Sequence, residues 1–140
     1  MTAEFTLLRA LWPRLAGDGP DVPLGAGDDA AVVRIDGRDV AIAVDALVDA
    51  VHFDLGISSL ADIGWKSVAV NVSDMAAVGA RATAAVVALQ VPDAMGEAEV
   101  TALYEGMGEA GERWDLAIVG GDVVAGPALA VSLTTVGPLV

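Results

Sequence analysis

The chain has 140 residues, enough for one domain with its own hydrophobic core. Its twenty acidic and seven basic residues give a net charge of −13, which argues against nucleic acid or an anionic membrane as a partner. The sequence contains no cysteine, which excludes disulfide scaffolds, thiolate metal sites and cysteine nucleophiles. Oxygen ligands and one histidine, His52, remain as site chemistry, and we take a cytoplasmic location as the default.

The first part of the chain predicts a helix followed by a β-hairpin. Apolar residues at helical spacing predict an amphipathic helix over residues 4–15. Two β-rich runs, 30–35 and 40–47, flank Asp36-Gly37, a dipeptide that favours the backbone angles of tight hairpin turns. We therefore expect these runs to pair as antiparallel strands.

The rest of the chain alternates helices with strands. Helical patterns cover residues 59–78, with Gly79 as a stop signal, and residues 96–114. Predicted strands cover residues 82–91, 116–119 and 128–136. The order αββαβαββ predicts an α/β domain in which helices cover one face of a mixed β-sheet. The mean hydropathy of +0.62 indicates further apolar surface buried against another subunit or domain.

Polar residues interrupt the apolar pattern of the second predicted helix. Ser67, Asn71 and Asp74 fall on one stripe, because steps of four and three residues nearly close a helical turn. Their neighbours are apolar, so we expect the Asp74 carboxylate to lie in or beside packed apolar surface, where an unpaired charge is expensive. The alternatives are helix capping or plain solvent exposure.

Two further carboxylates accompany predicted strands. Asp45 interrupts the run 40–47, and Asp122 follows the strand 116–119 and two glycines. We place both at strand ends, where α/β folds present ligands. Gly120-Gly121 would let the backbone approach a phosphate, although Gly-Gly-Asp is also a common turn.

A fourth acidic position follows a pair of glycines. The segment from Gly25 to Ala30 places Asp28 and Asp29 side by side in a form that fits G-x-G-x-x-A. A dinucleotide-binding loop needs a strand before it and a helix after it, whereas here prolines precede and a hairpin follows. We reject the dinucleotide interpretation.

These acidic positions together indicate a metal site. Clustered carboxylates without nearby cations are stable only when they are protonated or bound to metal, and Mg²⁺ is the natural candidate. An acidic protein can hold a polyphosphate through such cations, which bridge phosphate oxygens to carboxylates.

Four segments resemble the thiamine-monophosphate kinases in order and spacing. They are Gly25-Ala26-Gly27-Asp28-Asp29-Ala30-Ala31, Asp45 with Val51-His52-Phe53, residues 71–80, and Ile118-Val119-Gly120-Gly121-Asp122. The wider superfamily includes aminoimidazole ribonucleotide synthetase and selenophosphate synthetase. The resemblance covers the whole chain but only the N-terminal half of such an enzyme. We therefore interpret residues 1–140 as a single N-terminal ATP- and Mg²⁺-binding domain, with the family's C-terminal domain outside this chain.

The resemblance implies ATP-dependent phosphorylation of thiamine monophosphate to thiamine diphosphate, with several Mg²⁺ ions held by aspartates. The implied metal ligands are Asp28, Asp29, Asp45, Asp74 and Asp122, of which the last three also act in catalysis. His52 matches a residue near the thiamine phosphate, unless it is an ordinary strand-end histidine. Gly121, Asp122 and Tyr104 match nucleotide-side positions, although a helix tyrosine is also common in simple packing. The resemblance further implies a homodimer formed through the sheet.

One departure from the family concerns hydroxyl groups. Ala43 and Val44 stand where the family usually has Ser/Thr-Thr before the aspartate that corresponds to Asp45. Two alternatives therefore stay open: another ATP-using enzyme of the superfamily with a different phosphate acceptor, or a non-catalytic dimerising module. We expect this domain alone to be inactive or weakly active, because phosphoryl transfer requires donor, acceptor and metals to be positioned together.

Overall fold

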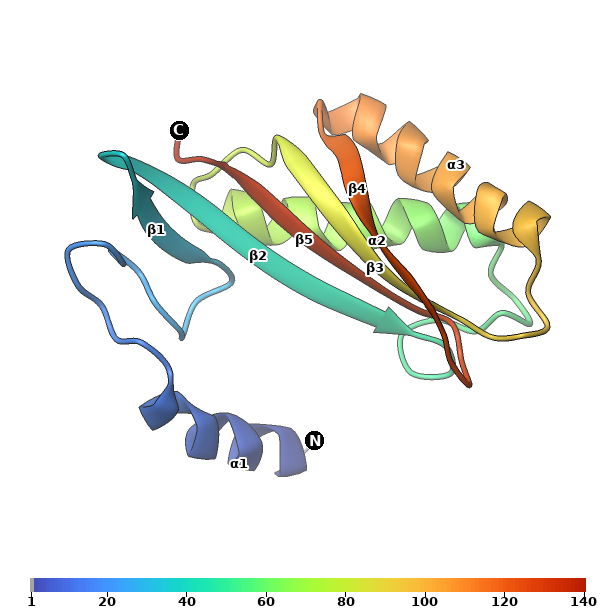
Figure 1. The fold of residues 1–140 in the computed structure, drawn as a ribbon, viewed down its shortest axis with the longest axis horizontal. Helices are drawn as coiled ribbons and strands as arrows, with labels where there is room; N and C mark the ends of the chain where they lie inside the picture. The colour runs from blue at the N-terminus through green and yellow to red at the C-terminus, as the bar shows by residue number, and fades with distance from the viewer. Residues whose placement is uncertain (1) are drawn as a thin grey trace.

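The computed structural model describes residues 2–140 of the chain. Three α-helices, a short 3₁₀ turn and five strands follow one another along it (Figure 1). Their bounds are α1 Thr2–Leu11, η1 Trp12–Arg14, β1 Ala31–Ile35, β2 Arg38–Val48, α2 Leu60–Ala77, β3 Ala84–Val91, α3 Glu97–Trp114, β4 Ala117–Ala125 and β5 Ala130–Pro138. The predicted order αββαβαββ is therefore confirmed.

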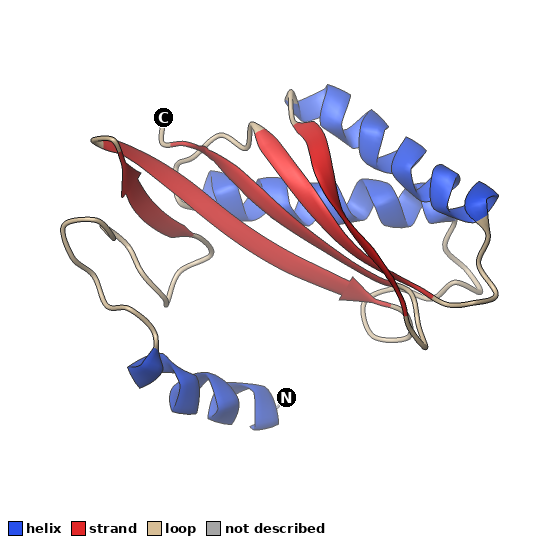
Figure 2. Cartoon of the chain, viewed as in Figure 1, coloured by secondary structure: helices blue, strands red, loops and turns tan. Residues whose placement is uncertain are grey.

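The five strands form one mixed sheet in the order β1-β2-β5-β3-β4. Every neighbouring pair is antiparallel except β3 and β4, which run parallel. Helix α2 packs on β2 and β5, and α3 packs on α2 and β4, so both helices lie on the same side of the sheet (Figures 1 and 2). This confirms the predicted α/β architecture with helices on one face.

Local sequence signals account for where these elements begin and end. The hydroxyl of Ser59 accepts a hydrogen bond from the Asp62 amide and caps the N-terminus of α2. After α2, Gly79 adopts a φ of 73°, and the Ala80 amide returns to the Met75 carbonyl. In the hairpin, Asp36 and Gly37 both have positive φ, as a type I′ turn requires.

The hydrophobic core lies between the sheet and the helices α2 and α3. Alternate residues of β5 face the helices and are buried, among them Val131 and Leu133. The two helices approach closely because Gly64 and Gly106 lack side chains. A Cβ at either position would overlap a backbone carbonyl of the opposite helix. The helix-covered face of the sheet is thus tightly packed.

Two predicted boundaries and one predicted placement were wrong. Strand β2, close to its predicted extent of 40–47, runs through Asp45 without ending there, because β5 pairs with it along this whole stretch. Strand β4 continues through Gly120, Gly121 and Asp122, because it pairs with β3 up to Ala125. Asp45 and Asp122 therefore lie inside strands and not at their ends. The first helix stops at Leu11, since Pro13 lacks the amide that would continue it, and residues 12–14 form a 3₁₀ turn.

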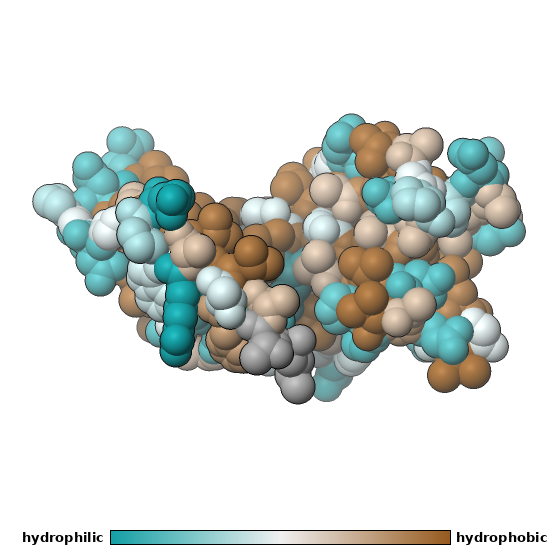
Figure 3. Space-filling view, turned by 90° about the horizontal axis from the view of Figure 1, so that it is seen from below, coloured by the Kyte–Doolittle hydropathy of each residue, from teal (hydrophilic) through white to brown (hydrophobic). Residues whose placement is uncertain are grey.

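Two apolar surfaces have no helix or strand packed on them in the described part of the chain. The first is the sheet face opposite the helices, which we call the uncovered face, where Val44 is 63% and Val86 is 44% exposed. The second is α1, which contacts no described helix or strand except the 3₁₀ turn (Figure 2). Exposed apolar side chains on and just after α1 are Phe5, Leu7, Leu8, Leu11, Trp12 and Leu15. The view from below shows apolar side chains reaching the surface between hydrophilic ones (Figure 3).

None of the helices among residues 2–140 combines the length and the apolar character needed to cross a membrane.

Candidate functional site

Asp74 on α2 lies beside Asp45 on β2, and Asp29, in the loop before β1, is near enough for its charge to act on Asp74. Burial raises the pKa of the Asp74 carboxyl, and the negative charges of Asp45 and Asp29 and a hydrogen bond with Asp45 raise it further. Every charge identified as acting on Asp74 is thus negative. Asp74 is half-buried, which is compatible with the expected place beside packed apolar surface.

The side chain of Asn71 fixes this arrangement. It is fully buried, and its Oδ1 accepts a hydrogen bond of 3.2 Å from the Asp45 amide. Its Nδ2 donates to the carbonyl of Ser67 at 2.9 Å, one turn earlier in α2. Asn71 therefore links the helix directly to the strand at Asp45. Sequence reasoning placed Asn71 on the right stripe but assigned it no partner.

Asp122 does not join these three carboxylates within one chain. Across the sheet, Asp45 pairs with Leu133, Leu133 with Val87, and Val87 with Gly121. Asp45 and Gly121 are therefore three strand spacings apart, or roughly 14 Å. Asp122 pairs with Ala88, whose neighbours Val87 and Leu89 are buried under the helices. Asp122 therefore lies on the uncovered face.

The glycine pair before Asp122 has a structural use. A Cβ at Gly121 would overlap the backbone of Val87, so this position requires the absence of a side chain. Nothing lies within 4 Å of a Cβ built on Gly120. A close approach of Gly121 to a phosphate stays a prediction, whereas its close approach to β3 is observed.

The loop that contains Asp28 and Asp29 lies beside the N-terminal segment. The Asp28 carboxylate accepts a hydrogen bond of 2.8 Å from the Asp29 amide. Gly27 has a φ of 122°, and a Cβ on it would lie 2.7 Å from the Trp12 ring. A cavity of about 670 Å³ separates this loop from the apolar side chains of α1. No helix follows the loop directly, which agrees with the rejection of a dinucleotide-binding motif.

His52 lies in an exposed turn directly after β2. Its Nδ1 accepts a hydrogen bond of 3.0 Å from the Val48 amide. The ammonium group of Lys66, on α2, donates to the His52 carbonyl at 2.6 Å. The alternative of an ordinary strand-end histidine is compatible with this position, but it does not account for the lysine.

Tyr104 borders a separate cavity of about 500 Å³ at the carboxyl ends of β3 and β4. The other lining residues include Val91, Met95, Val100 and Val123. Burial raises the pKa of the Tyr104 hydroxyl. A mostly apolar lining with a few polar groups is typical of small-molecule sites.

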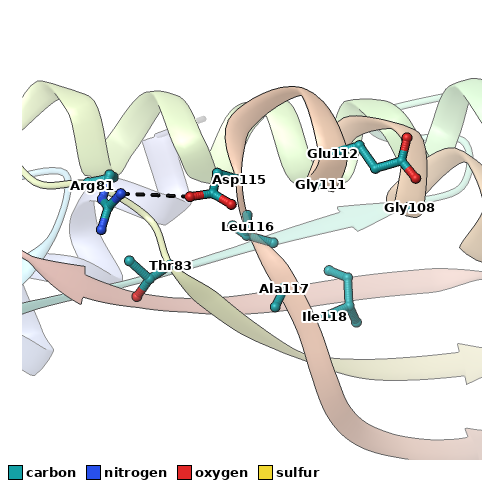
Figure 4. A pocket seen from close by; sticks show the side chains of 9 residues that line it. All are labelled: Arg81, Thr83, Gly108, Gly111, Glu112, Asp115, Leu116, Ala117 and Ile118. Atoms are coloured by element: carbon teal, nitrogen blue, oxygen red, sulfur yellow. Dashed lines mark ion pairs between the residues drawn. The ribbon is translucent and has the colours of Figure 1, made fainter.

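Another cavity, of about 690 Å³, lies at the opposite end of these strands (Figure 4). Arg81 and Asp115 face each other across it at 3.7 Å. None of the predicted site residues lines it.

Comparison with known proteins assigns the family. The family model of AIR synthase related protein, N-terminal domain, matches residues 27–139. The chain belongs to this family. The sequence is 39% identical to the thiamine-monophosphate kinase of Bacillus subtilis (strain 168) over 138 residues, which are 97% of this chain and 42% of that protein. It is 45% identical to the Mycobacterium tuberculosis thiamine-monophosphate kinase over 84% of this chain and 35% of that one.

Solved structures agree with this assignment. AaThiL complexed with AMPPCP and TMP matches with a TM-score of 0.79 at 27% identity, over 96% of this chain and 40% of that one. A protein of Thermus thermophilus matches with a TM-score of 0.86 at 29% identity, over 97% of this chain and 44% of that one. The AIR synthase related domain thus spans less than half the length of these relatives.

The carboxylates of this AIR synthase related domain can bind Mg²⁺ in one particular mode, in which other ligands complete the coordination. Among residues 2–140, no three acidic or imidazole groups are arranged to hold one ion by themselves. Mg²⁺ is commonly bound through one or two carboxylates, with water and substrate phosphates as its other ligands. The neighbouring carboxylates of Asp45 and Asp74 fit that mode, because the like charge that raises the pKa of Asp74 is one that a cation would neutralise.

Ala43 and Val44, which stand where the family usually has hydroxyl side chains, lie next to threonine residues of β5. Ala43 pairs with Thr135 and Val44 with Thr134 across the β2-β5 ladder of the domain. The Thr135 hydroxyl is buried and donates to the Ala43 carbonyl at 3.4 Å. Thr134 lies opposite Val44 on the uncovered face.

Proposed function

We propose that this chain is the ATP- and Mg²⁺-binding part of a thiamine-monophosphate kinase, which transfers the terminal phosphoryl group of ATP to thiamine monophosphate. The observation that supports it most is the pairing of Asp45 with Asp74 beside the buried Asn71, with Asp29 near enough to act on Asp74. The curated relatives at 39% and 45% identity bear that enzyme's name. Because the chain spans only part of their length, the complete reaction is part of the proposal.

The carboxylates of Asp45 and Asp74, with Asp29 near them, would hold Mg²⁺. When bound, the ion would bridge carboxylate to phosphate oxygens and neutralise charge that develops during phosphoryl transfer. The protein's own contribution is orientation. Asn71 holds the backbone of Asp45 against α2, so that the two carboxylates keep a fixed spacing.

The cavity beside Tyr104 is the proposed location of the nucleotide base. Its lining is mostly apolar and includes Val123 of β4, the residue that follows Asp122. The backbone at Gly121 stays the proposed phosphate-side position of the nucleotide, and Asp122, on the uncovered face, is proposed as a further Mg²⁺ ligand. AaThiL complexed with AMPPCP and TMP, an ATP analogue and the phosphate acceptor, has this fold.

The acceptor phosphate is assigned to His52. With its Nδ1 occupied by the Val48 amide, the neutral ring has its proton on Nε2, where it can donate to a phosphoryl oxygen. The turn is exposed, so an acceptor can reach it from solvent.

A homodimer through the uncovered face is part of the same proposal. Val44 and Val86 are exposed there in the middle of the sheet, where water would otherwise contact a broad apolar surface. A second copy packed on this face would also meet Asp122. We expect light scattering to show a dimer, and Val86→Asp to shift it to monomer, because a buried unpaired carboxylate in the interface is costly. A wild-type chain that is monomeric at high micromolar concentration would contradict this.

Two other functions are favoured by one specific observation, which is that Ala43 and Val44 have no hydroxyl groups. Fewer hydroxyl groups near Asp45 would suit a superfamily enzyme with a different acceptor, or a module that has lost catalysis. Both alternatives keep the fold and the dimer.

The test compares binding and turnover. The 140-residue chain is mixed with ATP and Mg²⁺ and with thiamine monophosphate, thiamine being the matched control without phosphate. A chimaera adds the remaining part of the Bacillus subtilis relative. We expect the chain to bind thiamine monophosphate but not thiamine, and the chimaera to form thiamine diphosphate much faster than the chain. Turnover of another phosphate acceptor, or ATP binding without any transfer in the chimaera, would favour one of the alternatives.

A further inference from the structure

The turn that presents His52 is held by several of its own hydrogen bonds. The Val51 and His52 amides both donate to the Val48 carbonyl, at 3.1 and 2.9 Å, and the Ala50 amide donates to the Phe53 carbonyl at 2.8 Å. Ala50 has a φ of 62°, a conformation that a residue with a Cβ rarely adopts. Strained, over-determined turns of this kind recur where a side chain must be held in one orientation.

The imidazole of His52 is also fixed from inside the turn. Its Nδ1 is the acceptor for the Val48 amide at 3.0 Å, so the ring cannot rotate without breaking that bond. The neutral ring then has one tautomer, with the proton on Nε2. Turn and ring together leave a single donor, Nε2–H, to point away from the backbone.

Lys66 reaches this turn from α2, fourteen residues further along the chain. Its Nζ donates to the His52 carbonyl at 2.6 Å, a short charge-assisted bond. Lys66 is the only lysine in a chain with twenty acidic residues, yet the ion pairs of residues 2–140 do not include it. The Lys66 ammonium therefore donates to a backbone carbonyl, although the chain offers many carboxylates as alternative partners.

We propose that Lys66 is a positioning residue that locks the His52 turn onto α2 and so aims Nε2–H of His52 at the phosphate of the acceptor. The inference rests on the proposed function for the identity of that phosphate. Because α2 also contains Asn71 and Asp74, one rigid helix fixes both the acceptor contact and the metal carboxylates. Their relative position is what an in-line phosphoryl transfer requires.

The first experiment examines the ring directly. His52 is the only histidine, so its two ring nitrogens give unambiguous signals in ¹⁵N-labelled protein. At about pH 8, where an ordinary histidine is neutral, we expect the wild type to show one tautomer with Nδ1 unprotonated. In Lys66→Met the two nitrogen shifts should move toward the averaged values of a free ring, and Lys66→Arg should restore the wild-type pattern. Unchanged ring shifts in Lys66→Met would overturn the positioning role.

The second experiment adds the ligand. Thiamine monophosphate is titrated while the Nε2 signal is followed, and Lys66→Met should weaken its binding about tenfold, with Lys66→Arg within about threefold of wild type. Arg81→Met removes the same charge at the far end of the sheet and should leave affinity unchanged. Weaker binding with an unaltered ring pattern would assign Lys66 a direct charge contact, which contradicts the positioning role.

The two proposals fail in different ways. If thiamine monophosphate fails to shift the wild-type Nε2 signal, the proposed function is wrong for this acceptor, whereas the ring pattern still decides the role of Lys66. The near-ultraviolet signal of Trp65 and Trp114, whose tilted rings have centroids 4.9 Å apart, reports whether each variant is folded.

Discussion

The two faces of the sheet differ in how much of their apolar surface is buried within one chain. On the helix-covered face, Leu133 and Val87 are fully buried, and Asn71 ties the helix layer to β2. On the uncovered face, Val44 and Val86 remain exposed, although they lie in the same sheet. The covered face is complete within one chain and holds Asp45 beside Asp74. The uncovered face, with Asp122, has the composition of a surface that another layer completes.

The largest expected effect breaks the covered face. Leu133→Ala removes a side chain buried between β5 and the helices, and we expect it to lower the free energy of unfolding by about 2–5 kcal/mol. Val44→Ala, on the adjacent strand but on the uncovered face, should change the stability of the monomer by less than about 0.5 kcal/mol. Urea unfolding measures both. Equal losses would show that the two faces are packed alike.

A smaller effect is expected at the link between the layers. Asn71→Ala removes the side-chain acceptor of the Asp45 amide and the second donor to the Ser67 carbonyl, which should cost about 1–3 kcal/mol. It should also weaken Mg²⁺ binding, because Asp45 loses its fixed position. Ser73→Ala, at an exposed position of the same helix, serves as the control. If Asn71→Ala leaves both stability and metal affinity at wild-type values, the link is not what holds the carboxylates together.

The third effect is a change in pH dependence. Because the pKa of Asp74 is raised by burial and by Asp45 and Asp29, the native state keeps this proton to higher pH than the unfolded chain does. Stability therefore falls as pH rises from the ordinary aspartate range through the raised pKa. Asp74→Asn should lack this fall and should unfold at higher urea than wild type at pH 7, in the absence of metal. A variant that is less stable at pH 7 would contradict the like-charge account.

Several parts of the fold follow from local signals in the sequence. The hairpin at Asp36-Gly37 and the stop of α2 at Gly79 depend on neighbouring residues alone, and both were predicted correctly. The end of β4 was wrong because the glycine pair was taken as a boundary, and Asp45 was wrongly placed at a strand end because a polar residue was taken as one. Pairing with β5 and β3, which depends on distant residues, extends those strands past Asp45 and Asp122.

The same limit applies to the candidate site. The stripe of Ser67, Asn71 and Asp74 was predictable from helical periodicity, and the burial of Ser67 and Asn71 agrees with it. The separation of Asp122 from Asp45 was not predictable, because it depends on strand order and on which face each residue occupies. The contact between Lys66 and His52 likewise follows from the placement of α2 on the sheet and leaves no mark in the spacing of the two residues.

The central claim is that Asp45 and Asp74 on the covered face together hold Mg²⁺ with a nucleotide. Isothermal titration of the chain with AMPPCP, with and without Mg²⁺, tests it most directly. We predict metal-dependent binding that Asp45→Asn and Asp74→Asn each weaken at least tenfold, or about 1.4 kcal/mol, while Asp115→Asn at the distant cavity leaves it unchanged. Binding that is independent of Mg²⁺, or equal in wild type and in both site variants, would contradict the account.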